Sequence, residues 1–176
     1  MTSLLTLIVL SLSFQLYAET PKPVTLRGIL LEQLRTTHNE KDWFVPIDVA
    51  VEGLTAEQAT WKDGSGNHSV GQLTNHLLFW NARELAKFKG EPPEKYSGNN
   101  DETFNNFDAK KWDETCKRLD AVMTELEKLV ETADDAKLQT IASEIAHIRT
   151  HNAYHVGQII FVRKLQGSWN PEKGVK

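Results

Sequence analysis

Apolar residues that recur every three or four positions are the feature that most constrains how this chain can fold. The pattern is clearest between about Leu138 and Gln166, where the stripe consists of Ile141, Ile145, Ile148, Ile159 and Val162. No segment alternates between apolar and polar residues with a period of two, and no internal repeat is present. The spacing therefore predicts helices, each with one face buried against a neighbouring helix.

Capping and turn residues divide the chain into four main helices. Ser69 and Gln72 form an S-x-x-Q capping box, and Gly167 stands where a helix commonly ends. A short helical piece is expected at Ile47 to Glu52, and residues 90–107 are predicted to be a loop. The main helices are predicted from Leu26 to about His38, from about Val70 to Lys89, from the N-cap Asp108 to about Val130, and from about Leu138 to Gln166. We therefore expect an all-α fold, an antiparallel four-helix bundle.

The first eighteen residues have the composition of a secretory leader. They contain no charged side chain, and the apolar run from Leu4 to Phe14 is shorter than the ~20 residues of a membrane span. Leu16 and Ala18 occupy the −3 and −1 places of a cleavage site. We predict a cleaved signal peptide over residues 1–18 and one bundle domain over residues 19–176. An uncleaved anchor and a buried segment are the alternatives.

These features bound the location and the partners of the protein. A cleaved leader implies a periplasmic or secreted protein without stable membrane insertion. The single cysteine, Cys116, excludes an internal disulfide and is either a small packing residue or a reactive thiol. The formal charge of −4, with no basic block, argues against nucleic acid as a partner. A homodimer formed through an exposed apolar helix face is possible.

Three of the six histidines lie within nine residues of the last helix. At 100° per residue His155 falls inside the isoleucine stripe, His151 at its edge and His147 on the flank. Unpaired polar groups in a core cost ~1–3 kcal/mol each, so His151 and His155 need partners. Histidines at i and i+4 project from one face, and both can reach one ion. The spacing alone leaves two readings open, a metal site and hydrogen-bonded core or surface histidines.

A metal site would need a ligand from another helix, and His76 is the candidate. It lies in the middle of the predicted helix 70–89, flanked by Leu73 and Leu77. Alone, such a histidine is more often a buried residue with satisfied hydrogen bonds than a ligand. Beside an existing histidine pair it becomes a reasonable third ligand.

Several motifs together resemble the DinB-like family of metalloenzymes, which includes the YfiT-like bundles. They are HSVGQLTNHLLFW and the downstream THNAYHVGQIIFVRK, joined by RTTHNEKDWFVPI and VEGLTAEQA near the front. The resemblance extends from about Leu26 to Gln166. It implies a four-helix bundle in which three histidines hold a divalent metal ion, and the matching positions here are His76, His151 and His155. The chain departs from the family at Val156, where arginine is frequent.

The expected chemistry follows from a coordination sphere that three neutral imidazoles leave incomplete. Water fills the open positions of such an ion, and its pKa falls toward ~7. Imidazole ligands suit zinc, nickel or iron. We therefore expect a metal-dependent hydrolase acting on an unknown small molecule. The alternatives are a non-catalytic bundle with a structural or sequestering metal, and a thiol-dependent S-transferase, which export makes less favourable because such thiols are mainly cytosolic.

Other residues carry weaker predictions. Glu84 and Glu144 are either carboxylates near the metal or ordinary surface residues. His38 extends the stripe of Leu30 and Leu34, which indicates a core or inter-helix role, and His68 is predicted to be a loop residue. The tryptophans that either line a pocket or pack in the core are Trp43, Trp61 and Trp80.

Overall fold

The computed structural model describes residues 24–175. The predicted leader, residues 1–18, lies outside this range. Over the described residues the chain is all-helical, without strands, as predicted. The helices are α1 (Leu26–His38), α2 (Ile47–Val51), α3 (Ala56–Thr60), α4 (Val70–Lys89), α5 (Asp101–Asn105), η1 (Ala109–Lys111), α6 (Trp112–Thr132), α7 (Asp135–Gln166) and η2 (Pro171–Lys173). In this part of the chain no helix combines the length and the hydropathy needed to cross a bilayer.

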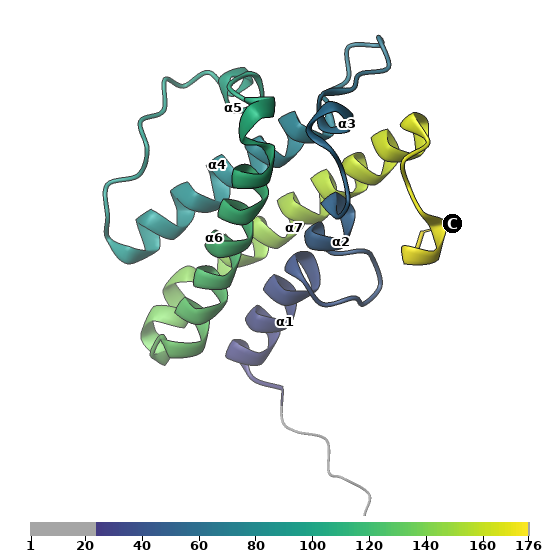
Figure 1. The fold of residues 1–176 in the computed structure, drawn as a ribbon. Helices are drawn as coiled ribbons and strands as arrows, with labels where there is room; N and C mark the ends of the chain where they lie inside the picture. The colour runs from purple at the N-terminus through teal and green to yellow at the C-terminus, as the bar shows by residue number, and fades with distance from the viewer. Residues whose placement is uncertain (1–23, 176) are drawn as a thin grey trace, which may run out of the picture.

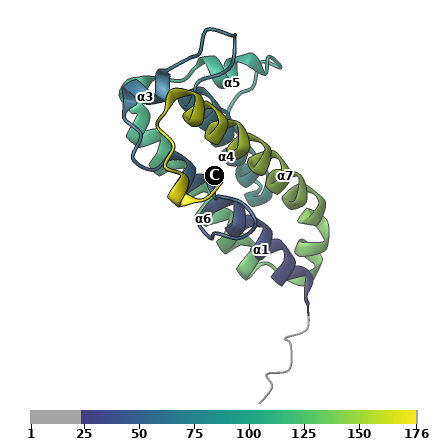
Figure 2. The same cartoon turned by 90° about the vertical axis from the view of Figure 1, so that its right-hand side faces the viewer.

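The four long helices pack side by side around a common core (Figures 1 and 2). α4 packs on α6 and α7, and α1 packs on the same two helices. α6 and α7 are joined by only two residues, so they form an antiparallel helical hairpin. The short helices cover this framework, with α2 packed on α7 and α3 on α4.

Local capping fixes the ends of α4 and α7. The Ser69 hydroxyl accepts from the Gln72 backbone N–H while the Gln72 side chain accepts from the Ser69 N–H, which confirms the predicted capping box. α7 begins at Asp135 rather than near Leu138, because the Asp134 carboxylate accepts from the Lys137 N–H and caps the first turn. The earlier start adds three residues to the helix.

The prediction that residues 90–107 form a loop was partly wrong. Within residues 90–107, Asp101–Asn105 form α5, and its residues Thr103 and Phe104 are buried. One short helix with two buried residues gives no periodic stripe, so the pattern could not reveal it. Asp108 also caps a different element from the one predicted. Its carboxylate accepts from the Lys110 N–H at the start of η1, which then leads into α6.

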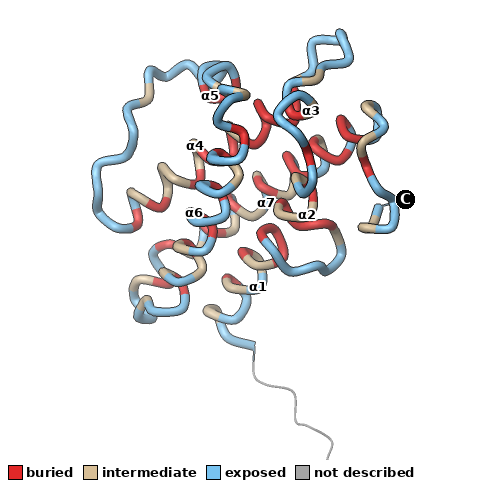
Figure 3. Tube along the Cα trace, in the orientation of Figure 1, coloured by how far each residue is buried: buried red, intermediate tan, exposed pale blue. Residues whose placement is uncertain are grey.

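Two apolar clusters fill the core, and Figure 3 marks the buried positions along the chain in red. One cluster joins the N-terminal halves of α4 and α6 to the C-terminal half of α7. The other joins α1 to the opposite halves of those helices. The clusters meet on α7 between Ile148 and Val156, and on α4 between Leu78 and Leu85. The predicted histidine pair and the buried Asn81 and Asn152 lie in this polar layer between them.

Candidate metal centre

The structure brings the three predicted histidines together. His76 comes from the first half of α4, and His151 and His155 come from successive turns of α7, which packs on α4. The Nε2 atom of His151 lies 3.0 Å from Nε2 of His76 and 3.1 Å from Nε2 of His155. His76 and His155 are buried and His151 is half-buried. The i,i+4 pair of α7 and the histidine of α4 therefore supply converging nitrogen atoms.

A hydrogen-bond relay sets the tautomer of His76. Its Nδ1 lies 2.6 Å from the Thr103 hydroxyl, and that hydroxyl donates its only proton to the Asn100 carbonyl, also at 2.6 Å. The Thr103 oxygen must therefore accept from Nδ1–H of His76. This leaves the Nε2 lone pair of His76 directed at the other two histidines. Metal-ligating histidines are commonly oriented by such a partner on the other ring nitrogen.

Gln158 sets the tautomer of His155 in the same way. The Gln158 Oε1 atom lies 2.6 Å from Nδ1 of His155, and a carbonyl oxygen can only accept. The Gln158 amide nitrogen donates to the Tyr154 hydroxyl at 3.1 Å, which agrees with this orientation. Sequence reasoning missed both orienting residues. Gln158 follows His155 by three positions and could have been found by helical spacing, whereas Thr103 lies in the segment predicted to be a loop.

Burial keeps the three imidazoles neutral. Loss of hydration, reinforced by the neighbouring histidines, lowers the pKa of His76 to about 3. Burial and His151 lower the pKa of His155 to about 4, although the Gln158 bond opposes this. Burial also lowers the pKa of His151. At neutral pH the three rings therefore offer lone pairs rather than charges.

The arrangement fits a metal ion better than it fits hydrogen bonds among the rings. Nε2 of His151 carries at most one proton, so it can donate to His76 or His155 but not to both. At least one buried lone pair then stays without a donor. Two nitrogen ligands of one ion, each about 2.0–2.1 Å from it, stand about 2.8–3.4 Å apart at angles between 90° and 110°. The two measured nitrogen separations, 3.0 and 3.1 Å, fall in that range.

Aromatic rings support the centre from one side. Phe104 of α5 stacks on His76 with ring centroids 3.9 Å apart and planes 7° apart. His68 stacks on the other face of the Phe104 ring, also at 3.9 Å. His68 is thus a loop residue, as predicted, but with a packing role that only the fold reveals. Stacking holds the His76 plane in place.

A pocket of about 430 Å³ opens beside the centre. His151 is part of its wall, and the carboxylate-bearing Glu84 and Glu144 line it too. The remaining lining residues are Trp80, Asn81, Lys87, His147, Ile148 and Asn152. The structure therefore places both predicted glutamates in one pocket with a candidate ligand. Glu84 also forms an ion pair with Lys87 at 3.2 Å.

Apart from Trp80, the other singled-out residues lie away from the centre. Of the tryptophans, only Trp80 lines this pocket, Trp61 packs against the core, and Trp43 is 96% exposed. Cys116 is half-buried against the core, and burial together with nearby Asp113 and Asp48 raises its thiol pKa to about 12. This supports a packing role and argues against a reactive thiolate. His38 is fully buried, in line with its predicted core role.

The chain is similar to a known family of proteins. A scan against protein-family models matches the DinB superfamily over residues 47–159, which is well over half of the 176 residues. No match was found among the curated proteins or among the solved structures. The matched region holds all three histidines and the whole pocket beside them. The resemblance predicted from the motifs is thus confirmed, and the chain belongs to the DinB superfamily.

Proposed function

We propose that His76, His151 and His155 hold one divalent metal ion and that the protein is a metal-dependent hydrolase acting on a small molecule. The support for the ion is the convergence of three neutral imidazole nitrogens from two helices, with ring tautomers fixed by Thr103 and Gln158. The donor set suits zinc, nickel or iron. Three protein ligands are typical of catalytic zinc sites, whereas structural sites usually have four.

The pocket beside His151 is the observation that carries the hydrolase proposal. It adjoins the centre and contains two carboxylates, Glu84 and Glu144, each half-buried. An ion at the centre would supply Lewis acidity to a water or a substrate in this pocket. Either glutamate would serve as the general base or acid that hydrolysis needs. Glu144 is the better candidate for the base because Glu84 already has Lys87 as its partner.

We also propose that the protein works outside the cytoplasm. The uncharged, apolar stretch at residues 1–18, which has the composition of a secretory leader, supports this. A small-molecule substrate fits the pocket volume, which is within the usual range for such ligands.

Metal analysis of three proteins tests the centre. Mature wild-type protein purified without an affinity tag is compared with His155→Ala and with His147→Ala, a matched control that removes an exposed histidine from the same helix. We expect His155→Ala to lose about one metal ion per chain and His147→Ala to keep it, because His155, unlike His147, directs a nitrogen into the centre. Equal trace metal in all three would contradict the proposal.

Turnover tests the hydrolase step separately. The wild-type protein should hydrolyse at least one of a panel of p-nitrophenyl esters and phosphates, and a chelator should abolish this. Glu144→Gln should keep the metal while losing about 10²–10⁴-fold in rate, the usual contribution of a general base. Full metal content without any turnover, or turnover that the chelator leaves intact, would contradict a metal-dependent hydrolase.

A further inference from the structure

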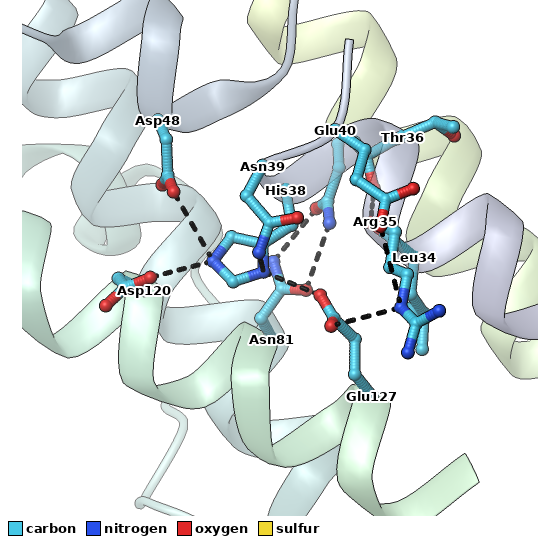
Figure 4. A network of polar contacts seen from close by, with 12 residues as sticks. Leu34, Arg35, Thr36, His38, Asn39, Glu40, Asp48, Asn81, Asp120 and Glu127 are labelled. Atoms are coloured by element: carbon cyan, nitrogen blue, oxygen red, sulfur yellow. Dashed lines mark hydrogen bonds and ion pairs between the residues drawn. The ribbon is translucent and has the colours of Figure 1, made fainter. Parts of the chain in front are cut away.

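His38 is the centre of a second group of ligating side chains, which shares no residue with the first group. It ends α1 and is fully buried, and its ring lies between α2 and α6 (Figure 4). Nδ1 of His38 lies 2.6 Å from Glu127 Oε1, and Nε2 lies 2.9 Å from Asp120 Oδ1 and 3.7 Å from Asp48 Oδ2. Both ring nitrogens of this histidine therefore face carboxylates.

The proton on His38 can be assigned at one nitrogen. Glu127 is only 13% exposed in its side chain and approaches Nδ1 at the shortest distance in the group, so Nδ1–H donates to it. The Asn39 amide nitrogen lies 3.1 Å from the same Nδ1, a longer contact that cannot compete for a protonated nitrogen. The remaining nitrogen, Nε2, then faces Asp120 and Asp48. As a bare lone pair it would be repelled by both, so it requires a proton or a metal ion.

A proton would satisfy this arrangement only in part. One N–H can donate to Asp120, which leaves Asp48 at 3.7 Å without a hydrogen bond from the ring. Among the described residues no other side chain bonds the Asp48 carboxylate. Three carboxylates thus surround a ring that can supply one positive charge.

A divalent cation would satisfy all of these groups. We propose that His38 Nε2, Asp48 and Asp120 form a second divalent-cation site, in which Glu127 orients the imidazole. Nitrogen and oxygen ligands about 2.0–2.1 Å from one ion stand about 2.9–3.7 Å apart at angles between 90° and 130°. The separations from Nε2 to Asp120 and Asp48, 2.9 and 3.7 Å, match these limits. The ligand atoms of the three residues all lie within 4.8 Å of one another.

The surroundings agree with a site that takes its ion from solvent. The side chains of Asp48 and Asp120 are 41% and 57% exposed, so the ion can enter from the surface and keep water on that side. One imidazole with two carboxylates suits Zn²⁺ or Mn²⁺. A carboxylate on the second ring nitrogen, here Glu127, is the usual arrangement behind a ligating histidine. The Arg35 Nε atom lies 3.7 Å from Glu127 Oε2, so an ion pair with Arg35 helps to keep the Glu127 carboxylate in place.

The site would connect three elements that the first centre does not involve. His38 ends α1, Asp48 is in the first turn of α2, and Asp120 lies on α6, whereas the first three histidines come from α4 and α7. An ion here would fasten α2 and the preceding loop to the bundle. The inference does not rest on the proposed function, because the two sites share no ligand.

Calorimetric titration with Zn²⁺ tests the second site. After chelation and dialysis, wild-type protein should bind about two ions per chain, and His155→Ala should bind about one. Asp120→Asn keeps an oxygen that can accept from His38 but loses the charged ligand, and should also bind about one, with an affinity loss of 100-fold or more at that site. Asp113→Asn, an exposed aspartate on the same helix, is the control and should bind about two.

The Zn²⁺ affinity of a Glu127 variant and the nitrogen-15 spectrum of His38 test the second site independently of the ion count. Glu127→Gln should weaken the second site by about 10–100-fold, as expected for a residue that orients a ligand. Nitrogen-15 spectra of His38 should show Nε2 losing its proton and shifting when Zn²⁺ is added. A second ion absent from every titration, or a His38 ring that stays doubly protonated in excess Zn²⁺, would overturn the proposal. One ion lost in Asp120→Asn but kept in His155→Ala would support the second site and overturn the first.

Discussion

At the scale of single residues, the candidate metal centre depends on side chains that do not point into it. Thr103 and Gln158 each occupy the outer nitrogen of a histidine and so leave the inner nitrogen with its lone pair. Thr103 does this because its own proton is already donated to the Asn100 carbonyl. The properties of His76 as a ligand are therefore fixed by a residue 27 positions away, on α5.

Replacing Thr103 by valine tests this relay. Valine keeps the shape but removes the oxygen that accepts from His76, so the ring loses its fixed tautomer and orientation. We expect the affinity of the first site for Zn²⁺ to fall about 10–100-fold, with a folded protein by circular dichroism. Thr124→Val, at an exposed position of α6, should leave the affinity unchanged. An unchanged affinity in Thr103→Val would show that the hydroxyl does not orient His76.

At the scale of elements, the contacts between a helix and its neighbours decide whether a glycine in that helix can be replaced by a larger residue. The first turn of α4 lies so close to the Phe107 side chain that a Cβ on Gly71 would be 2.3 Å from the ring. Gly157 on α7 is helical as well, yet a Cβ there meets nothing within 4 Å. The two glycines have the same backbone conformation and opposite surroundings, which makes them a matched pair.

The paired substitutions should move stability in opposite directions. Gly71→Ala forces the Phe107 ring to shift and should destabilise the protein by about 1–3 kcal/mol, the usual cost of overpacking. Gly157→Ala should stabilise it by about 0.5–1 kcal/mol, because alanine loses less backbone entropy in a helix. Urea denaturation of both variants measures the difference. Equal free energies of unfolding would mean that Phe107 does not pack on α4 as observed.

At the scale of the whole molecule, buried histidines link stability to pH. The pKa of His76 is lowered to about 3 in the folded state, so the unfolded chain binds more protons between that value and the ordinary 6.5. The free energy of unfolding is therefore undiminished by His76 above pH 6.5, and it decreases as the pH falls below that value. His38 behaves in the opposite sense. Burial would lower its pKa, but bonds to Glu127 and Asp120 raise it overall, so its contribution is lost as the pH rises.

The pH effect of His76 is isolated by comparing two metal-free proteins. In the wild-type protein, proton uptake on unfolding should cost about 2 kcal/mol of stability at pH 5 relative to pH 7.5 through His76 alone. His76→Gln lacks this titration while His38 remains, so its stability should fall less over the same range. Urea unfolding of both chelated proteins at the two pH values gives the comparison. Parallel losses in the two proteins would rule out a buried, neutral His76.

Two of the wider predictions stay predictions. The possible homodimer would need an exposed apolar face, and α7 offers one in Tyr154, Phe161 and Leu165, which are 63%, 57% and 48% exposed. Export from the cytoplasm rests on residues 1–18 alone.

The sequence by itself determined the local features of this protein. Helical periodicity and capping located α1 and α4 correctly, and the spacing of His151 and His155 placed both on one face of α7, because these properties depend on residues within a few turns. The third candidate ligand, His76, followed from its position inside a helix combined with the motif resemblance. The all-α fold class followed in the same way.

Tertiary structure alone decided the contacts between segments distant in sequence. Thr103 reaches His76 only because α5 folds onto α4, and Glu84 meets Glu144 in one pocket only because α4 packs on α7. Asp48 and Asp120 likewise face His38 only once α2 and α6 close around the end of α1. Neither hydrophobic periodicity nor capping motifs predict such contacts, because the contacts depend on how the helices pack and not on where each helix begins or ends.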